Sequence, residues 1–214
     1  IHLSNSYVSD DFFGLMDDSE GDLDAGGLVD IGIGRFPVRS VAEANAILNK
    51  ITNYIQDGIS FGAQNGSCSS GCNSTYGDWR NVICFIGDDE DVGVHASQAN
   101  TMADDLRVQH KNYNVEKIFL DAYQQISSAG GQRYPEATKA IDHRIEKGAL
   151  ILNYTGHGGE VGLAHERIVN VSQINGWTNI ERLPLVFTAT CEFSRYDDPG
   201  RTSAGELSLV NPDG

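Results

Sequence analysis

Ile151-Leu-Asn-Tyr-Thr-Gly-His157 is a short apolar run that ends in a histidine, and Leu185-Val-Phe-Thr-Ala-Thr-Cys191 is a second run that ends in a cysteine. Each run has the length and composition of a buried β-strand. Ligands bind outside the carboxyl ends of the strands in an open parallel sheet. If these two strands are neighbours, His157 and Cys191 therefore lie side by side at one edge of the sheet.

An imidazole beside a thiol is the minimum set of groups for nucleophilic acyl transfer, because the thiolate attacks while the histidine moves the proton. A lone Gly-His-Gly is more often a structural turn, and a lone cysteine at a strand end is more often part of the core. The pairing of His157 with Cys191 favours catalysis over both. The backbone N–H groups of Gly158 and Cys191 are the simplest candidates for an oxyanion hole. The sequence therefore predicts a cysteine peptidase.

A third group could orient the histidine. Glu90 lies in Gly87-Asp-Asp-Glu-Asp91, directly after a predicted strand at residues 81–86, so it reaches the same edge of the sheet. The alternative is that this acidic loop is solvated or binds a metal, and it applies equally to Asp88, Asp89 and Asp91. His95 and His165 have no comparable companion in the sequence.

Strands and helices alternate along most of the chain. This order predicts an α/β fold with right-handed crossovers and a parallel sheet covered on both faces by helices. The predicted strands are Leu28–Gly34, Asn81–Gly87, Val115–Leu120, Ala149–Tyr154 and Leu185–Thr190. The predicted helices are Val41–Ile55, His95–Val108, Pro135–Lys147, Val171–Asn175 and Ser203–Val210, the first with a capping box at Ser40 and Glu43.

The charge of the chain limits its partners. Its 214 residues contain 15 Lys plus Arg and 30 Asp plus Glu, a formal charge of −15. This balance argues against nucleic acid or anionic lipid as the main partner and is compatible with basic substrates. No apolar run reaches the roughly 18 residues that a membrane span requires. The chain begins at Ile1 and ends in Asn211-Pro-Asp-Gly214, so we expect a processed chain or a fragment, with any export signal outside it.

Two polar segments carry other candidate sites. Cys68 and Cys72 lie in a glycine-rich loop, where they could form a small disulfide or remain free thiols; a zinc site lacks the second ligand pair. Residues 17–24 contain five acids, and calcium prefers several oxygens from one flexible loop. A structural Ca²⁺ site and a solvated acidic turn are both open there. The candidate ligands are Asp17, Asp18, Asp22 and Asp24.

Four motifs together resemble the gingipain family of caspase-like cysteine peptidases. The similarity runs in order over most of the chain, and within the family it is greatest to the surface peptidases of the type IX secretion system. Tyr7-Val-Ser-Asp-Asp-Phe-Phe-Gly14 and Cys191-Glu-Phe193 also fit that branch. The four motifs are Asn153-Tyr-Thr-Gly-His-Gly158, Phe187-Thr-Ala-Thr-Cys191, Asp30-Ile-Gly-Ile-Gly-Arg-Phe-Pro37 and Trp79–Asp91.

The resemblance implies a caspase-like α/β fold of two subdomains. Residues 1–62 would be the end of the first, which is only partly present, and residues 63–78 a Gly/Ser/Cys-rich insertion or linker. Residues 79–214 would be most of the second, catalytic subdomain, truncated at its C-terminus. The resemblance also implies His157 as base, Cys191 as nucleophile and Glu90 as the acid that assists the histidine.

Gingipains cleave after Arg or Lys and bind calcium. The secretion-system branch removes the C-terminal sorting domain of exported cargo and joins the new carboxyl end to lipopolysaccharide. The resemblance therefore implies cargo proteins, other outer-membrane components of that system and lipopolysaccharide as partners, and a place on the cell surface or outside the cell. No cofactor is needed for this chemistry.

The chain departs from the family in one motif. Gingipains follow the nucleophile with a small or apolar residue and then Asn-Gly, whereas this chain has Glu192-Phe193. Their strict basic specificity is therefore not transferred, and Asp91 and Glu192 stand only as candidate substrate contacts. Two other functions stay open: a general secreted protease that cleaves after Arg or Lys, and a non-catalytic binding module that keeps the fold.

Overall fold

The structure is a computed structural model that describes residues 8–18, 20, 28–60 and 77–214. The chain divides into two compact units, residues 1–38 and residues 39–214. Cys68 and Cys72 lie outside the described residues, so the proposed disulfide is not tested. The domain boundaries that the resemblance implies, at residues 62 and 79, also stay predictions.

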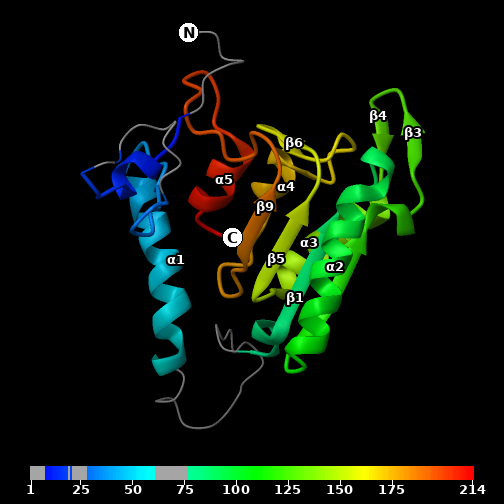
Figure 1. The fold of residues 1–214 in the computed structure, drawn as a ribbon, viewed down its shortest axis with the longest axis horizontal. Helices are drawn as coiled ribbons and strands as arrows, with labels where there is room; N and C mark the ends of the chain where they lie inside the picture. The colour runs from blue at the N-terminus through cyan, green and yellow to red at the C-terminus, as the bar shows by residue number, and fades with distance from the viewer. Residues whose placement is uncertain (1–7, 19, 21–27, 61–76) are drawn as a thin grey trace. The chain divides into compact units, whose positions relative to one another are not determined.

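The second unit is built on a four-stranded parallel sheet (Figure 1). Its strands are β1 (Val82–Gly87), β2 (Asn114–Phe119), β5 (Ile151–Thr155) and β9 (Leu185–Ala189), in the order β2-β1-β5-β9. All three neighbouring pairs are parallel. The predicted α/β class and mostly parallel sheet are confirmed.

Helices cover both faces of this sheet. Alternate residues of a strand point to opposite faces, and the two sets in β1 belong to two different clusters. Ile83 and Phe85 pack in the cluster that includes Ala99 of α2 (Val94–Gln109). Cys84 and Ile86 pack in the larger cluster that includes Ile141 of α3 (Pro135–Lys147). The buried body of the sheet is therefore apolar on both sides, as predicted.

The predicted helix ends are largely confirmed. Helix α3 begins at Pro135, and Gly148 ends it with a positive φ of 80°, a conformation that favours glycine. Helix α5 (Ala204–Val210) begins with a complete capping box formed by Ser203 and Glu206. The remaining helices are α1 (Val41–Ser60) and α4 (Val171–Ile174).

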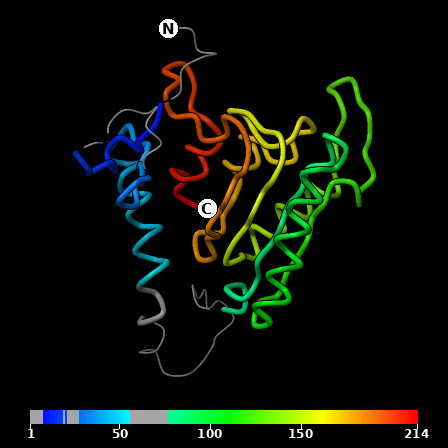
Figure 2. The backbone as a smooth tube through the Cα atoms, in the orientation of Figure 1, coloured from blue at the N-terminus to red at the C-terminus, as the bar shows by residue number. Residues whose placement is uncertain are grey.

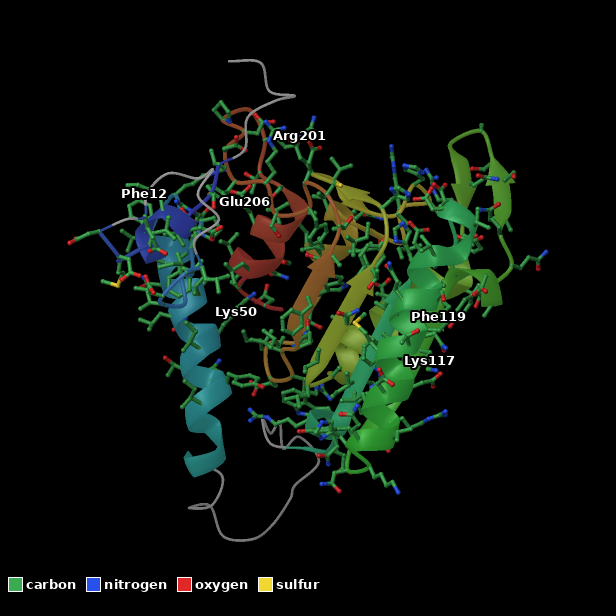
Figure 3. All side chains as sticks on the ribbon, viewed as in Figure 1. Phe12, Lys50, Lys117, Phe119, Arg201 and Glu206 are labelled. Atoms are coloured by element: carbon green, nitrogen blue, oxygen red, sulfur yellow. The ribbon has the colours of Figure 1, made fainter. Side chains whose placement is uncertain are left out.

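Helix α1 contacts α5 within the second unit. Lys50 of α1 is buried, donates a hydrogen bond of 2.9 Å to the Ser208 carbonyl of α5, and is labelled in Figure 3. Burial lowers the pKa of Lys50 to about 8. Arg39, which precedes α1, forms an ion pair of 3.0 Å with Glu206. Polar contacts thus hold α1 against α5.

Two strand predictions need correction. Residues 28–34 form no strand, and their apolar side chains are exposed, Leu28 at 86%. A strand needs a hydrogen-bonded neighbour, and none pairs with this segment in the described part of the chain. β9 is present, but it is not buried: Leu185, Val186 and Phe187 are about half exposed, at 56%, 49% and 52%. The reason is that β9 is an edge strand of the sheet. The helical spacing of apolar residues in α2 also predicts that Met102 faces inward, but its side chain is exposed.

Five short strands were not predicted. β3 (Ile126–Ser128) and β4 (Gly131–Arg133) form a hairpin, and three strands of two residues form a small antiparallel sheet directly after His157. Strands this short show no measurable alternation of apolar and polar residues. The three strands are β6 (Gly158–Gly159), β7 (Gly162–Leu163) and β8 (Val169–Asn170). Among the described residues, no helix is both long and apolar enough to cross a membrane.

Candidate active site

The segments that follow β1, β5 and β9 leave the sheet at the same end, because these strands are parallel (Figure 2). We call these segments, residues 88–93, 156–160 and 190–193, the carboxyl edge. Thr155 of β5 lies opposite Ala189 of β9, so His157 and Cys191 each lie two positions beyond that pair. The predicted neighbouring strands are confirmed.

The contact between the two segments extends past the strand ends. The Gly156 N–H donates a hydrogen bond of 3.2 Å to the Ala189 carbonyl. A Cβ at Gly158 would lie 2.4 Å from Thr190 Oγ1, so only glycine fits there. The residues that flank His157 therefore touch the residues that precede Cys191. Cys191 itself is a free, exposed cysteine.

Asp91 is the carboxylate hydrogen-bonded to the histidine. His157 Nε2 lies 2.9 Å from Asp91 Oδ2. Glu90 Oε2 lies 3.9 Å from the same nitrogen, within ion-pair range but beyond a hydrogen bond, and 2.8 Å from His165 Nδ1. The structure thus brings Glu90 to the histidine, as expected, and places Asp91 closer.

Two further histidines surround the His157 ring. The His165 ring stacks on it with centroids 5.0 Å apart and planes at 10°, and the His95 ring meets it edge-on at 5.2 Å. His95 Nε2 lies 3.3 Å from Asp91 Oδ2, so two imidazoles share one carboxylate oxygen. The hydrogen bond and charge of Glu90 raise the pKa of His165. Sequence reasoning found no companion for His95 or His165, because residues far apart along the chain meet here only after folding.

Buried groups fix the backbone of His157. Asp88, which is 0% exposed, accepts a hydrogen bond of 2.9 Å from the His157 N–H. Tyr154, also 0% exposed, donates a hydrogen bond of 2.5 Å to the His157 carbonyl. Burial, followed by the charge of Asp88, raises the pKa of Tyr154, so its hydroxyl stays a donor. A Cβ at Gly156 would lie 2.3 Å from Asp88 Cβ, which explains the glycine before the histidine.

Left-handed backbone conformations gather at the carboxyl edge. Asp91, Val92 and Gly93 have φ values of 53°, 60° and 73°, and Glu192, next to Cys191, has a φ of 54°. This conformation is unfavourable for β-branched residues such as valine, and strain of this kind clusters at functional sites. The loop that carries Asp91 and the turn that presents Cys191 therefore share an unusual geometry.

Glu160 links the histidine segment to the cysteine segment. It is buried, and its two carboxylate oxygens each lie 2.9 Å from an arginine nitrogen, one on Arg195 and one on Arg201. Its carbonyl accepts a hydrogen bond of 2.7 Å from the Ala204 N–H. Phe193 anchors the same segment in the core. We did not predict this link from the sequence, although a glutamate three residues after the candidate base was a visible signal.

The functional roles of Cys191, Gly158 and Glu192 stay predictions. Among the described residues, no hydrogen bond joins the His157 imidazole to the Cys191 thiol. Glu192 is exposed, and its carboxylate lies 4.0 Å from Arg195. What the geometry provides is a histidine held by Asp91, next to a segment that exposes a cysteine.

Three groups of side chains in the described residues could hold a metal ion. The first is Asp17, Glu20 and Asp30, the second is Asp88, Asp89 and Glu166, and the third is Asp91, His95 and His157. Of the predicted calcium ligands, Asp17 belongs to the first group, Asp18 does not, and Asp22 and Asp24 lie outside the described residues. In the second group Asp88 and Glu166 are buried and Asp89 is partly buried. Burial, followed by the charges of Asp89 and Asp88, raises the pKa of Glu166. The third includes the candidate base.

Comparison with known proteins identifies relatives. The family model described as Peptidase family C25 matches residues 2–214. The chain is similar to the crystal structure of the Arg-specific cysteine proteinase gingipain R (RgpB), with a TM-score of 0.65, 17% sequence identity and 94% of this chain covered. It is also similar to the complex of the Porphyromonas gingivalis RgpB pro- and mature domains, with a TM-score of 0.61, 18% identity and 85% of this chain covered.

The match is partial on the side of those structures. The chain spans 40% of the first solved chain and 37% of the second. No curated protein matches the sequence. At this identity the structural likeness establishes the gingipain-type, caspase-like fold, and it confirms the fold class expected from the sequence.

Proposed function

Because the chain belongs to Peptidase family C25, the gingipain-like cysteine peptidases, we propose that it is a cysteine endopeptidase with Cys191 as nucleophile and His157 as proton carrier. One observation carries this proposal: β5 and β9 pair in parallel, so both residues leave the sheet at one edge. Cys84, the other described cysteine, is buried in β1. Of the two, only Cys191 is accessible to a substrate.

The proposed reaction begins when the Cys191 thiolate attacks the carbonyl carbon of the scissile bond and forms a C–S bond. The C–N bond breaks, His157 gives its proton to the leaving amine, and a thioester remains. The N–H groups of Gly158 and Cys191 stabilise the oxyanion. His157 then takes a proton from water or a second amine, the oxygen or nitrogen forms a bond to the thioester carbon, and the C–S bond breaks, so the sulfur returns to thiolate and His157 to its protonated form. Water yields hydrolysis, whereas an amine yields transpeptidation.

Asp91 is proposed as the positioning carboxylate of this site. Its hydrogen bond of 2.9 Å engages Nε2 of His157, which leaves Nδ1 for exchange with the thiol. A carboxylate in this place fixes the ring and stabilises the imidazolium that forms. Glu90, at 3.9 Å, adds charge without a hydrogen bond and holds His165 instead. Asp91 and Glu192 remain candidates for contact with substrate.

We further propose that the physiological substrates are exported proteins with C-terminal sorting domains, as in the PorU branch of the family. The motifs of the sequence support this branch, and Glu192-Phe193 after the nucleophile separates the chain from Arg-specific gingipains. In this proposal the protein works on the cell surface beside other outer-membrane components of the type IX secretion system. Lipopolysaccharide is the proposed amine acceptor.

The test is cleavage by the full-length protein of a fusion between a globular protein and a C-terminal sorting domain, followed by intact mass. We expect one cut at the junction, and added hydroxylamine should convert the new carboxyl end to a hydroxamate. The Cys191→Ala variant should give neither product.

Two results would replace the proposal. Cleavage of unrelated proteins and short Arg or Lys substrates, with no preference for the junction, would identify a general gingipain-like protease. No cleavage of any substrate, with binding of the fusion retained, would identify a non-catalytic caspase-fold module.

A further inference from the structure

Two imidazoles and one carboxylate meet beside the carboxyl edge. Asp91 Oδ2 lies 2.9 Å from His157 Nε2 and 3.3 Å from His95 Nε2. One donor atom from each of the three side chains lies within 4.8 Å of the other two. His157 follows β5, whereas Asp91 precedes α2 and His95 lies in its first turn. The fold therefore brings three metal-ligating side chains from two segments to one point.

The separations of these donor atoms suit a small tetrahedral ion. Zinc binds nitrogen and oxygen at about 2.0–2.2 Å, so two ligands of a tetrahedral zinc ion lie about 3.4 Å apart. The two separations from Asp91 Oδ2 are within about 0.5 Å of this value. The donor atoms of the two histidines need to approach each other by at most about 1.4 Å. Both rings are partly exposed, so small side-chain rotations can close this gap.

The chemistry of the donor set selects the ion. Calcium and magnesium take oxygen ligands, whereas two imidazole nitrogens and one carboxylate oxygen are a set typical of zinc sites that keep a fourth position for water. In the part of the chain that the structure describes, no lysine or arginine forms an ion pair with Asp91. The Asp91 side chain is 59% exposed, so an ion can reach it from solvent.

His165 lies outside this donor set. Its ring stacks on the face of His157, and its Nδ1 lies 2.8 Å from Glu90 Oε2. A ring that lies parallel to His157 covers its face, whereas a metal ligand lies in the plane of the ring at the nitrogen. His165 therefore packs against the site without contributing a ligand to it.

We propose that Asp91, His95 and His157 form a binding site for a zinc ion, and that zinc bound there inhibits the peptidase reversibly. The inhibition rests on the proposed function, whereas binding does not. Zinc would take the Nε2 lone pair of His157, so the one proton of the ring would lie on Nδ1. This is the nitrogen proposed to exchange a proton with the Cys191 thiol, and with its own proton in place it cannot accept another. Zinc would also occupy Asp91, the positioning carboxylate.

Binding is tested on the full-length protein with Cys191→Ala, which removes self-cleavage and excludes the thiol as a zinc ligand. Isothermal titration with ZnCl₂ is run in excess CaCl₂, so that oxygen-only sites are already filled. We expect zinc to bind, and we expect His95→Gln in the same background to weaken the binding of one zinc ion by about tenfold or more. His143→Gln, at an exposed histidine of α3, is the matched control and should bind as the parent does. Thermal unfolding without zinc shows whether each variant folds.

Inhibition is tested with Cys191 intact, by the rate of cleavage at the cargo junction. Zinc should stop cleavage, and calcium-saturated EDTA, which takes up zinc without removing calcium, should restore it. Each protein is compared with its own zinc-free rate. In His95→Gln, the zinc concentration for half-inhibition should rise by about tenfold or more, whereas His143→Gln should behave as the parent does.

The site is overturned if zinc does not bind Cys191→Ala, if His95→Gln binds it as tightly, or if His143→Gln weakens it as much. Zinc that binds without slowing cleavage would overturn the inhibitory role. Inhibition that His95→Gln leaves unchanged would do so too, and would assign the inhibition to the Cys191 thiol. If no substrate is cleaved even without zinc, the proposed function fails, and the titration still decides the zinc site.

Discussion

The strands of the parallel sheet, which we call its body, and the carboxyl edge differ in side-chain polarity, burial and backbone conformation within a few residues of chain. In β1, Ile83, Phe85 and Ile86 are buried and apolar. The four residues after Gly87 are all acidic, and the next turn holds Asp91 and Val92 in left-handed conformations. The same change occurs after β5, where Tyr154 is wholly buried and His157 is partly exposed.

This contrast suggests a division of roles: the body of the sheet determines the stability of the fold, and the carboxyl edge carries the chemically reactive groups. The body gains free energy from apolar burial on both faces of the sheet. The edge holds carboxylates, the His157 imidazole with the rings of His95 and His165 against it, and unfavourable backbone conformations, which the body must support. Substitutions in the body should therefore act on folding, and substitutions at the edge should act on activity.

The largest expected effect is the loss of activity when the edge loses either reacting group. Cys191→Ala and His157→Ala should each reduce kcat/KM for the cargo junction by about 10³-fold or more, because the nucleophile and its proton carrier act as a unit. Cleavage rates of purified variants measure this. Cys84→Ala, in the body, is the matched control and should retain activity; a comparable loss there would erase the contrast.

The next largest effect is on stability. Ile86 is 0% exposed in the larger core cluster, so Ile86→Ala should lower the free energy of unfolding by about 3 kcal/mol through lost burial and a cavity. Urea denaturation measures the change. Val186→Ala on the half-exposed edge strand should cost less than about 1 kcal/mol. Equal losses at the two positions would show that β9 is as buried as β1.

A smaller effect separates the two carboxylates beside the histidine. Asp91→Asn should lower kcat by about 10- to 100-fold, less than for a buried triad carboxylate, because Asp91 is exposed to solvent. Glu90→Gln, at 3.9 Å, should change kcat by less than about 3-fold. The reverse order would restore Glu90 as the residue that orients His157. Unchanged unfolding temperatures would show that both effects are on activity.

The smallest effect is the pH dependence of the body. Burial, followed by the charge of Glu116, raises the pKa of Cys84 to about 12, from 9.0. Above about pH 9 the unfolded state loses this proton while the folded state keeps it, so stability falls as pH rises. The advantage of the parent over Cys84→Ala should shrink by about 1 kcal/mol per pH unit in this range. Urea denaturation at pH 8 and pH 10 measures it, and a constant difference would mean that Cys84 is not shielded.

Most of the body was predictable from the sequence. Apolar runs with turn residues at their ends identified β1, β2 and β5, and the spacing of apolar residues with Pro135 and Gly148 fixed α3. The segment at residues 28–34 has the same composition but forms no strand, because composition does not reveal whether a pairing strand exists. The apolar run at residues 185–189 predicted β9 correctly, as an apolar run did for β5. Its half-exposed side chains were not predictable, because they depend on the position of β9 at the end of the strand order.

The carboxyl edge was predictable in part. The positions of His157 and Cys191 followed from two strand ends, because parallel neighbours must end at one edge. The choice between Glu90 and Asp91 depends on a turn with left-handed residues at Asp91 and Val92, which neither side chain favours in isolation. The approach of His165 and Glu166 depends on a small sheet of two-residue strands, too short to show a pattern.

The most direct test of the central claim, that the parallel edge pairs His157 with Cys191, is the rate of iodoacetamide labelling of Cys191 at pH 6, located by peptide mass in the full-length protein. At this pH an ordinary thiol reacts slowly, because about 1% or less of it is thiolate. The account predicts rapid labelling of Cys191, a drop of about tenfold or more in His157→Ala, and no labelling of Cys84 in either protein. Slow labelling of Cys191 that His157→Ala leaves unchanged would contradict it.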